Sequence, residues 1–121
     1  MVTTNNYFVV QQEGPVTVVK FTEKHLNDSN IQQIAELLVG ITDQLGSGEL
    51  HLDFSDVHYL STAVMAKLLS LHKRVTNDGG RFVLTNVDAL YELFSVTRLT
   101  TVMDVRRKTE PGEAPAANPP S

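Results

Sequence analysis

The sequence predicts a single α/β domain, in which a mixed sheet of four to five strands packs against helices. Short β-rich runs alternate with segments whose apolar residues recur at helical spacing, a pattern typical of layered α/β folds. The first two runs are separated only by a short turn and should pair antiparallel, whereas strands joined through helices pair in parallel. A length of 121 residues with 41% hydrophobic content is sufficient for one compact core.

The first half of the chain predicts a hairpin, then a helix and a strand. The β-rich runs YFVV and VTVVKF flank Gly14 and Pro15, as the two strands of a hairpin would. Apolar residues then recur at helical spacing over residues 29–45, and Asp28 or Ser29 is available as the N-cap of this helix. The segment ELHLDF that follows predicts a third, short strand.

The second half predicts a long helix followed by shorter elements. The run STAVMAKLLSLHKRV has a broad apolar helical face and is followed by NDGG, which favours a helix end. RFVLTNV predicts a fourth strand, a short helix follows it, and TVMDV predicts a last short strand. The final segment, TEPGEAPAANPPS, holds four of the five prolines and has no hydrophobic pattern. We therefore expect a domain over residues 1–108 and a disordered Pro/Ala-rich tail over residues 109–121.

Composition excludes several classes of function. The formal net charge of −4 argues against direct binding of nucleic acid, whose phosphates require a basic surface. The chain has no cysteine, which excludes disulfides, thiolate catalysis and thiolate metal sites, and suits a reducing compartment. No apolar run approaches the roughly 18 residues needed to span a bilayer, and the N-terminus lacks the features of a secretion signal. We therefore expect a cytoplasmic protein that does not bind membranes.

Candidate catalytic residues lack the spacing of known active-site motifs. Asp56, His58 and Ser61 lie close in sequence, but a catalytic triad is assembled by geometry, and the G-x-S-x-G elbow is missing. The four histidines do not form HExxH or another tight ligand spacing, so we expect no metal site. Neither G-x-x-x-x-G-K-[ST] nor G-x-G-x-x-G, the glycine motifs that bind phosphate, occurs after any of the predicted strands. We therefore expect no nucleotide cofactor. These residues predict that the protein is not an enzyme.

The pair Ser61-Thr62 marks the point where a polar loop becomes the second long helix. In a purely structural interpretation, Ser61 is the N-cap and Thr62 is the first helical residue. A helix N-terminus has N–H groups without intrahelical partners and carries partial positive charge, so it also favours a phosphate. The local sequence therefore fits both a structural cap and a site of phosphorylation.

Residues 52–87, LDFSDVHYLSTAVMAKLLSLHKRVTNDGGRFVLTNV, resemble the STAS domains, and among them the stand-alone bacterial anti-sigma factor antagonists. In that family an Asp-Ser-Ser-Gly-Leu-Gly-like motif opens a helix that is followed by a Gly-Gly turn and a strand. Matched by position, the six motif residues are Ser61, Thr62, Ala63, Val64, Met65 and Ala66. With the preceding hairpin and helix, the resemblance covers about residues 7–105.

The resemblance implies a non-enzymatic domain that regulates transcription by binding a protein. Such a domain captures a partner, commonly a kinase-type anti-sigma factor, and thereby frees a sigma factor. Phosphorylation of the motif's hydroxyl by that kinase switches the capture off, which places the modification on Thr62, with Ser61 as the second candidate. The partner-binding residues implied here are His58, Tyr59, Ser61, Thr62, Met65 and Lys67.

Two other functions use the same surface. The motif's Asp is replaced by Ser61 and its glycines by Val64 and Ala66, so one alternative is a STAS scaffold subunit of a larger sensory or stress-signalling assembly that is never phosphorylated. The other is a small hydrolase or nucleotide-binding enzyme that uses the loop before the second helix.

Overall fold

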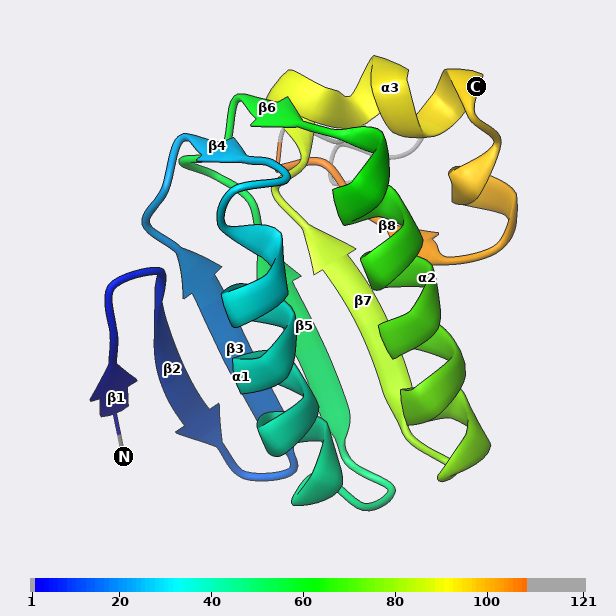
Figure 1. The fold of residues 1–121 in the computed structure, drawn as a ribbon. Helices are drawn as coiled ribbons and strands as arrows, with labels where there is room; N and C mark the ends of the chain where they lie inside the picture. Colours follow the sequence, from blue (N-terminus) through cyan, green and yellow to red (C-terminus); the bar gives the residue numbers. More distant parts are fainter. Residues whose placement is uncertain (1, 109–121) are drawn as a thin grey trace.

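The computed structural model describes residues 2–108 of the chain. Its main sheet has six strands in the order β1-β2-β3-β5-β7-β8, with α1 and α2 side by side on one face (Figure 1). The strands are β1 (Val2–Thr4), β2 (Phe8–Glu13), β3 (Val16–Phe21), β4 (His25–Leu26), β5 (Glu49–Asp53), β6 (Tyr59–Leu60), β7 (Arg81–Thr85) and β8 (Asp104–Val105). The helices are α1 (Ile31–Asp43), α2 (Thr62–Asn77) and α3 (Tyr91–Val96), with 3₁₀ turns η1 (Asp88–Leu90) and η2 (Leu99–Thr101). The predicted tail, residues 109–121, lies outside the described residues.

The predicted mixed sheet packed with helices is confirmed. β1, β2 and β3 pair antiparallel, and the remaining strands of the main sheet pair in parallel. β1 adds an edge strand beyond the four to five that the sequence predicts, because a three-residue strand is too short to show an alternating pattern. The two-residue strands β4 and β6, also not predicted, form a separate parallel pair. Figure 1 shows this pair at the end of the sheet where β3, β5 and β7 end.

The prediction that Asp28 or Ser29 caps α1 is wrong. The helix begins at Ile31, and Asn30 occupies the N-cap position without a side-chain bond to a helix amide. The Asn30 carboxamide oxygen instead accepts the backbone N–H of Asn27 at 2.9 Å, inside the preceding loop. The Asp28 carboxylate is therefore available for a contact elsewhere, which is described below.

A row of four aromatic rings runs through the core. The ring centroids of Phe8 and Phe21 are 6.0 Å apart, those of Phe21 and Phe54 are 5.1 Å apart, and those of Phe54 and Phe94 are 6.2 Å apart. All four side chains are buried. Tilted and edge-on pairs at these distances add a favourable ring contact to the burial of apolar area. The row connects β2 and β3 through the loop after β5 to α3, and so fixes that loop to the core.

The face of the sheet opposite α1 and α2 carries ion pairs. Alternation along β5 and β7 places Glu49, His51 and Arg81 on this face, because Leu50 and Phe82 point into the core. The His51 imidazole lies 2.9 Å from the Glu49 carboxylate, and its hydrogen bond lowers the pKa of Glu49.

The same face extends to β8, where one carboxylate meets two arginines. The guanidinium groups of Arg81 and Arg106 lie 2.8 Å and 3.0 Å from the carboxylate of Asp104. The hydrogen bond from Arg106 is the main cause that lowers the pKa of Asp104, and that from Arg81 acts in the same direction. Strand alternation therefore gives the sheet one apolar face beneath the two long helices and an opposite face that carries these ion pairs.

Candidate functional site

The loop that joins β5 to α2 is anchored by buried residues and displays exposed ones. Phe54, Val57 and Leu60 are 1%, 0% and 5% exposed, which fixes the loop at three points. Between these anchors the side chains of His58 and Tyr59 are exposed. The backbone of the loop is therefore held in place while these two side chains face outward.

The strand pair β4–β6 fixes the last part of this loop and the start of α2. The backbone N–H groups of His58 and Tyr59 donate to the Lys24 carbonyl at 2.7 Å and 3.2 Å. One residue before the helix, the Ser61 N–H donates to the Leu26 carbonyl at 3.1 Å. These bonds attach the start of α2 to the segment that precedes α1, so the two helix entries form one surface.

Ser61 is the N-cap of α2, as predicted. Its backbone is extended, with φ −85° and ψ 167°, and its hydroxyl oxygen accepts the Val64 N–H at 3.4 Å. The same hydroxyl donates to the Asp28 carboxylate at 2.9 Å. Sequence reasoning missed this contact, although the surplus of capping side chains in Asn27-Asp28-Ser29-Asn30 was a signal, because one helix needs only one N-cap. A carboxylate therefore lies at the helix start although the motif position itself is a serine.

Thr62 is the first residue of α2, and its side chain is exposed. Within residues 2–108, no hydrogen bond engages the Thr62 hydroxyl, in contrast to that of Ser61. The first turn of α2 contains no acidic residue. A negative group on Thr62 would therefore lie beside the positive end of a 16-residue helix, and the Asp28 carboxylate bonded to the preceding Ser61 would be a like charge beside it.

Comparison with known families and structures identifies the fold. The STAS domain family matches residues 7–112 of the chain. The chain belongs to the STAS domain family. The resemblance seen in the sequence is thus confirmed. No curated protein sequence matches this STAS domain.

Solved structures similar to this STAS domain include stand-alone anti-sigma factor antagonists. One, an anti-sigma factor antagonist (STAS) domain protein from Planctomyces limnophilus, is 23% identical with a TM-score of 0.76, over 88% of this chain and 93% of that chain. An anti-sigma factor antagonist from Mycobacterium paratuberculosis is 16% identical with a TM-score of 0.71, over 88% and 86%. The phosphorylated form of the Bacillus cell fate determinant SpoIIAA is 15% identical with a TM-score of 0.63, over 88% and 97%. At these identities the likeness shows the fold.

The motif of this STAS domain divides between the core and the surface. Val64 is fully buried, while Met65 and Lys67 are half-buried. The residue one turn after Thr62 is Ala66, which is exposed. Residues four apart share one face of a helix, so Thr62 and Ala66 form an exposed strip. Sequence reasoning did not include Ala66 among the binding residues, although its spacing from Thr62 would have indicated it.

The arrangement does not assemble a catalytic triad. The Ser61 hydroxyl donates to Asp28, and Asp56 lies 4.0 Å from Lys20. Within the part of the chain that the structure describes, no hydrogen bond joins the side chains of His58 and Ser61. In the same residues, no group of three His, Asp or Glu side chains is placed to hold a metal ion. No helix among them is long and apolar enough to cross a membrane.

Proposed function

We propose that this STAS domain is an anti-sigma factor antagonist that captures a kinase-type anti-sigma factor and thereby frees a sigma factor. Membership of the family and the likeness to solved antagonists support this role. The observation that carries it is the exposed, unengaged hydroxyl of Thr62 at the start of α2. The role requires no catalysis by this chain, and it places the protein in the cytoplasm, where sigma factors act.

The docking surface consists of the loop before α2 and the first turns of that helix. Its proposed residues are His58, Tyr59, Ser61, Thr62, Met65 and Lys67, to which the structure leads us to add Ala66. Tyr59 is 50% exposed, and its ring centroid lies 6.1 Å from that of His25. Tyrosine is enriched among the residues that dominate binding energy in interfaces. We expect Tyr59 to be the main apolar anchor of this docking surface.

Phosphorylation of Thr62 would switch this capture off. A phosphate adds about −1.5 to −2 charges at neutral pH, and the positive end of α2 stabilises it in the free protein. In the complex the same group would be removed from water, and burying a charge without a partner is strongly unfavourable. Thr62 is a better acceptor than Ser61, because the Ser61 hydroxyl already donates to Asp28 and accepts from Val64.

Asp28 gives this switch a feature that the motif alone does not show. Its carboxylate reaches Ser61 from the loop before α1, so an acid lies next to the residue that precedes the acceptor. We propose that Asp28 supplies the acidic group that the family motif carries at the position of Ser61. A phosphate on Thr62 would repel this carboxylate and loosen the contact between the two helix entries.

A pull-down from the native organism tests the proposed capture. The baits are the wild-type chain, Thr62→Ala, Thr62→Glu and, as a control, Thr76→Glu, which changes an exposed threonine in the last turn of the same helix. We expect all baits except Thr62→Glu to retain a kinase-type ATPase, identified by mass spectrometry. Equal retention by Thr62→Glu and the wild type would contradict the switch.

The alternative is a scaffold that uses the same surface and is never phosphorylated. The observation in its favour is that Val64 and Ala66 replace the two glycines of the motif, which makes the start of α2 bulkier than the family pattern. A scaffold would retain its partner in the Thr62→Glu pull-down, and its mass in cells would remain that of the unmodified chain. The two functions thus differ in both measurements.

A further inference from the structure

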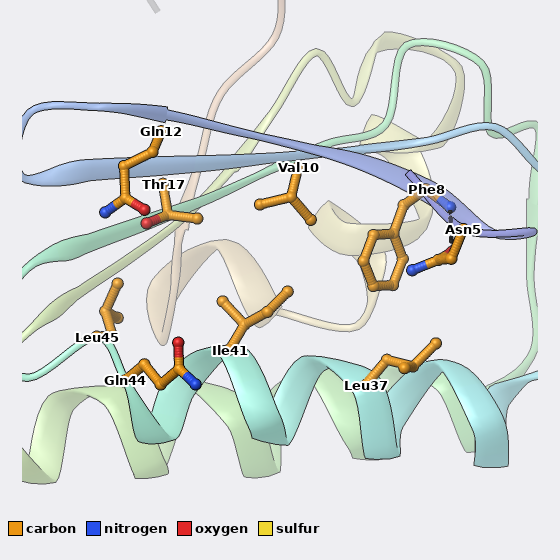
Figure 2. Close-up of a pocket in the computed structure, with 9 residues that line it drawn as sticks. All are labelled: Asn5, Phe8, Val10, Gln12, Thr17, Leu37, Ile41, Gln44 and Leu45. Carbon is orange, nitrogen blue, oxygen red and sulfur yellow. Dashed lines mark hydrogen bonds between the residues drawn. The ribbon is translucent and has the colours of Figure 1, made fainter. Parts of the chain in front are cut away.

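A cavity of about 310 Å³ opens between α1 and β2, on the helix-covered face of the sheet (Figure 2). Its position follows from the fold. Two helices packed about 10 Å apart cover less width than six strands spaced about 4.8 Å apart, so the inner face near the β2 edge is incompletely covered. Burial decreases along the inward-facing residues of β2: Phe8 is buried, Val10 is half-buried and Gln12 is exposed.

The lining has an apolar middle and a polar end. Phe8 and Val10 from β2 face Ile41 from α1 across the middle (Figure 2). At one end, Gln12 and Thr17 from the sheet face Gln44 from the end of α1. All of the lining side chains are uncharged. A charged ligand would therefore lose its hydration without gaining a counter-charge, which disfavours it strongly.

Thr17 provides a second, independent observation that indicates a ligand. Its side chain is 4% exposed and lies at the cavity, opposite Gln12 in the β2–β3 register. Within residues 2–108, no hydrogen bond engages the Thr17 hydroxyl. The hydroxyl is not among the fully buried atoms that lack a partner, so it is open to the cavity, and valine would fill the same volume in a strand that already contains three valines. The strand therefore presents to the cavity a polar group that a ligand can hydrogen-bond.

We propose that this cavity binds a small, uncharged, elongated amphiphile. Its hydroxyl or amide end bonds Thr17 and Gln44, and its alkyl portion lies between Phe8 and Ile41. The volume corresponds to about ten waters, and lies at the lower end of the range of small-molecule sites. The site is independent of the proposed function, because none of its lining residues belongs to the docking surface at the start of α2.

A titration of the full chain followed by two-dimensional ¹H–¹⁵N NMR tests the proposal with two probes of equal chain length. We expect 1-octanol to shift the backbone amide resonances of Phe8, Val10, Leu37 and Ile41 in a saturable manner. Octanoate carries a negative charge at the end where 1-octanol has its hydroxyl. It should bind at least about tenfold more weakly, because the lining offers no cation to its carboxylate. Absence of shifts at these amides, or equal binding of octanoate, would overturn the proposal.

Two variants and a control locate the ligand within the cavity. Thr17→Val should weaken the binding of 1-octanol by about fivefold, which is the effect of one hydrogen bond. Without ligand, this variant should unfold at the same temperature as the wild type or at a higher one. Leu37→Gln changes a lining residue that is 43% exposed and should also weaken binding, whereas Val96→Gln, at a 74% exposed position outside the lining, should not. Equal binding by all three variants would overturn the assignment.

Shifts of the same amides on raising the protein concentration alone would show that a second copy fills the cavity and would equally overturn it.

Discussion

The two sides of the helix-covered face differ in how completely they are packed. Beneath α2, the inward-facing residues Phe82 and Leu84 of β7 are almost fully buried, and Phe54 ties the loop after β5 to the core through Phe21 and Phe94. Beneath α1, the inner face of β2 borders a cavity. Under the two proposals made above, the packed side would present a fixed surface to a protein partner, and the open side would accommodate a small molecule.

The largest expected effect follows the removal of an aromatic side chain from the packed core. Phe54→Ala should lower the free energy of unfolding by about 3–5 kcal/mol, because it removes a buried ring that contacts two others. Leu37→Ala on the open side should cost less than about 1 kcal/mol, since that side chain is already 43% exposed. Urea unfolding of both variants measures the difference. Similar losses would show that the two sides are packed alike.

A smaller effect is expected where the two helix entries meet. Asp28→Ala and Ser61→Ala should each lower the free energy of unfolding by about 1 kcal/mol, because each removes the same hydrogen bond at the start of α2. The double variant should cost less than the sum of the two. Asp56→Ala is the control, because its exposed carboxylate does not contact Ser61 and its loss should add to that of Ser61→Ala. If the losses from Asp28→Ala and Ser61→Ala were additive, the Asp28 carboxylate would not interact with Ser61 at the helix start.

The smallest effect concerns the charged face of the sheet and depends on pH. The pKa of Asp104 is lowered from 3.8 in the folded protein, mainly by Arg106, so its ionised form stabilises the fold above pH 3.8. This stabilisation is lost as the pH falls from 3.8 through the lower folded-state pKa. Because Asp104 is partly exposed, Asp104→Asn should cost less than about 1 kcal/mol at pH 7. Urea unfolding should show that Asp104→Asn lowers the free energy of unfolding less at pH 3 than at pH 7. An equal loss at both pH values would contradict the role of the ion pairs.

The sequence predicted those parts of the fold that depend on local pattern. The apolar face of α2, the serine before it and the glycines after it define that helix, and the structure has it from Thr62 to Asn77. The hairpin around Gly14 was equally predictable, because the turn residues and the flanking β-rich runs are contiguous. β1 could not be recognised, since its pairing with β2 is determined by the edge of a sheet that the three residues themselves do not encode.

The site was predicted only as far as its local part extends. Ser61 as the cap and Thr62 as the first helical residue follow from adjacent residues. The bond from Ser61 to Asp28 joins positions 33 residues apart and depends on the pairing of β4 with β6, which no periodicity indicates. The cavity depends on how far two helices extend over six strands, which no local pattern indicates. In the sequence, nothing distinguishes Thr17 from the other residues of its β-rich run.

The position of the phosphate on this chain tests the central proposal most directly. The wild-type chain, Thr62→Ala and Ser61→Ala would each be incubated with ATP and the kinase-type partner recovered by the pull-down, then analysed by intact mass and peptide mapping. We expect one phosphate on Thr62 of the wild type and of Ser61→Ala, and none on Thr62→Ala. An unchanged mass for the wild type, or a phosphate that remains on Thr62→Ala, would contradict the account.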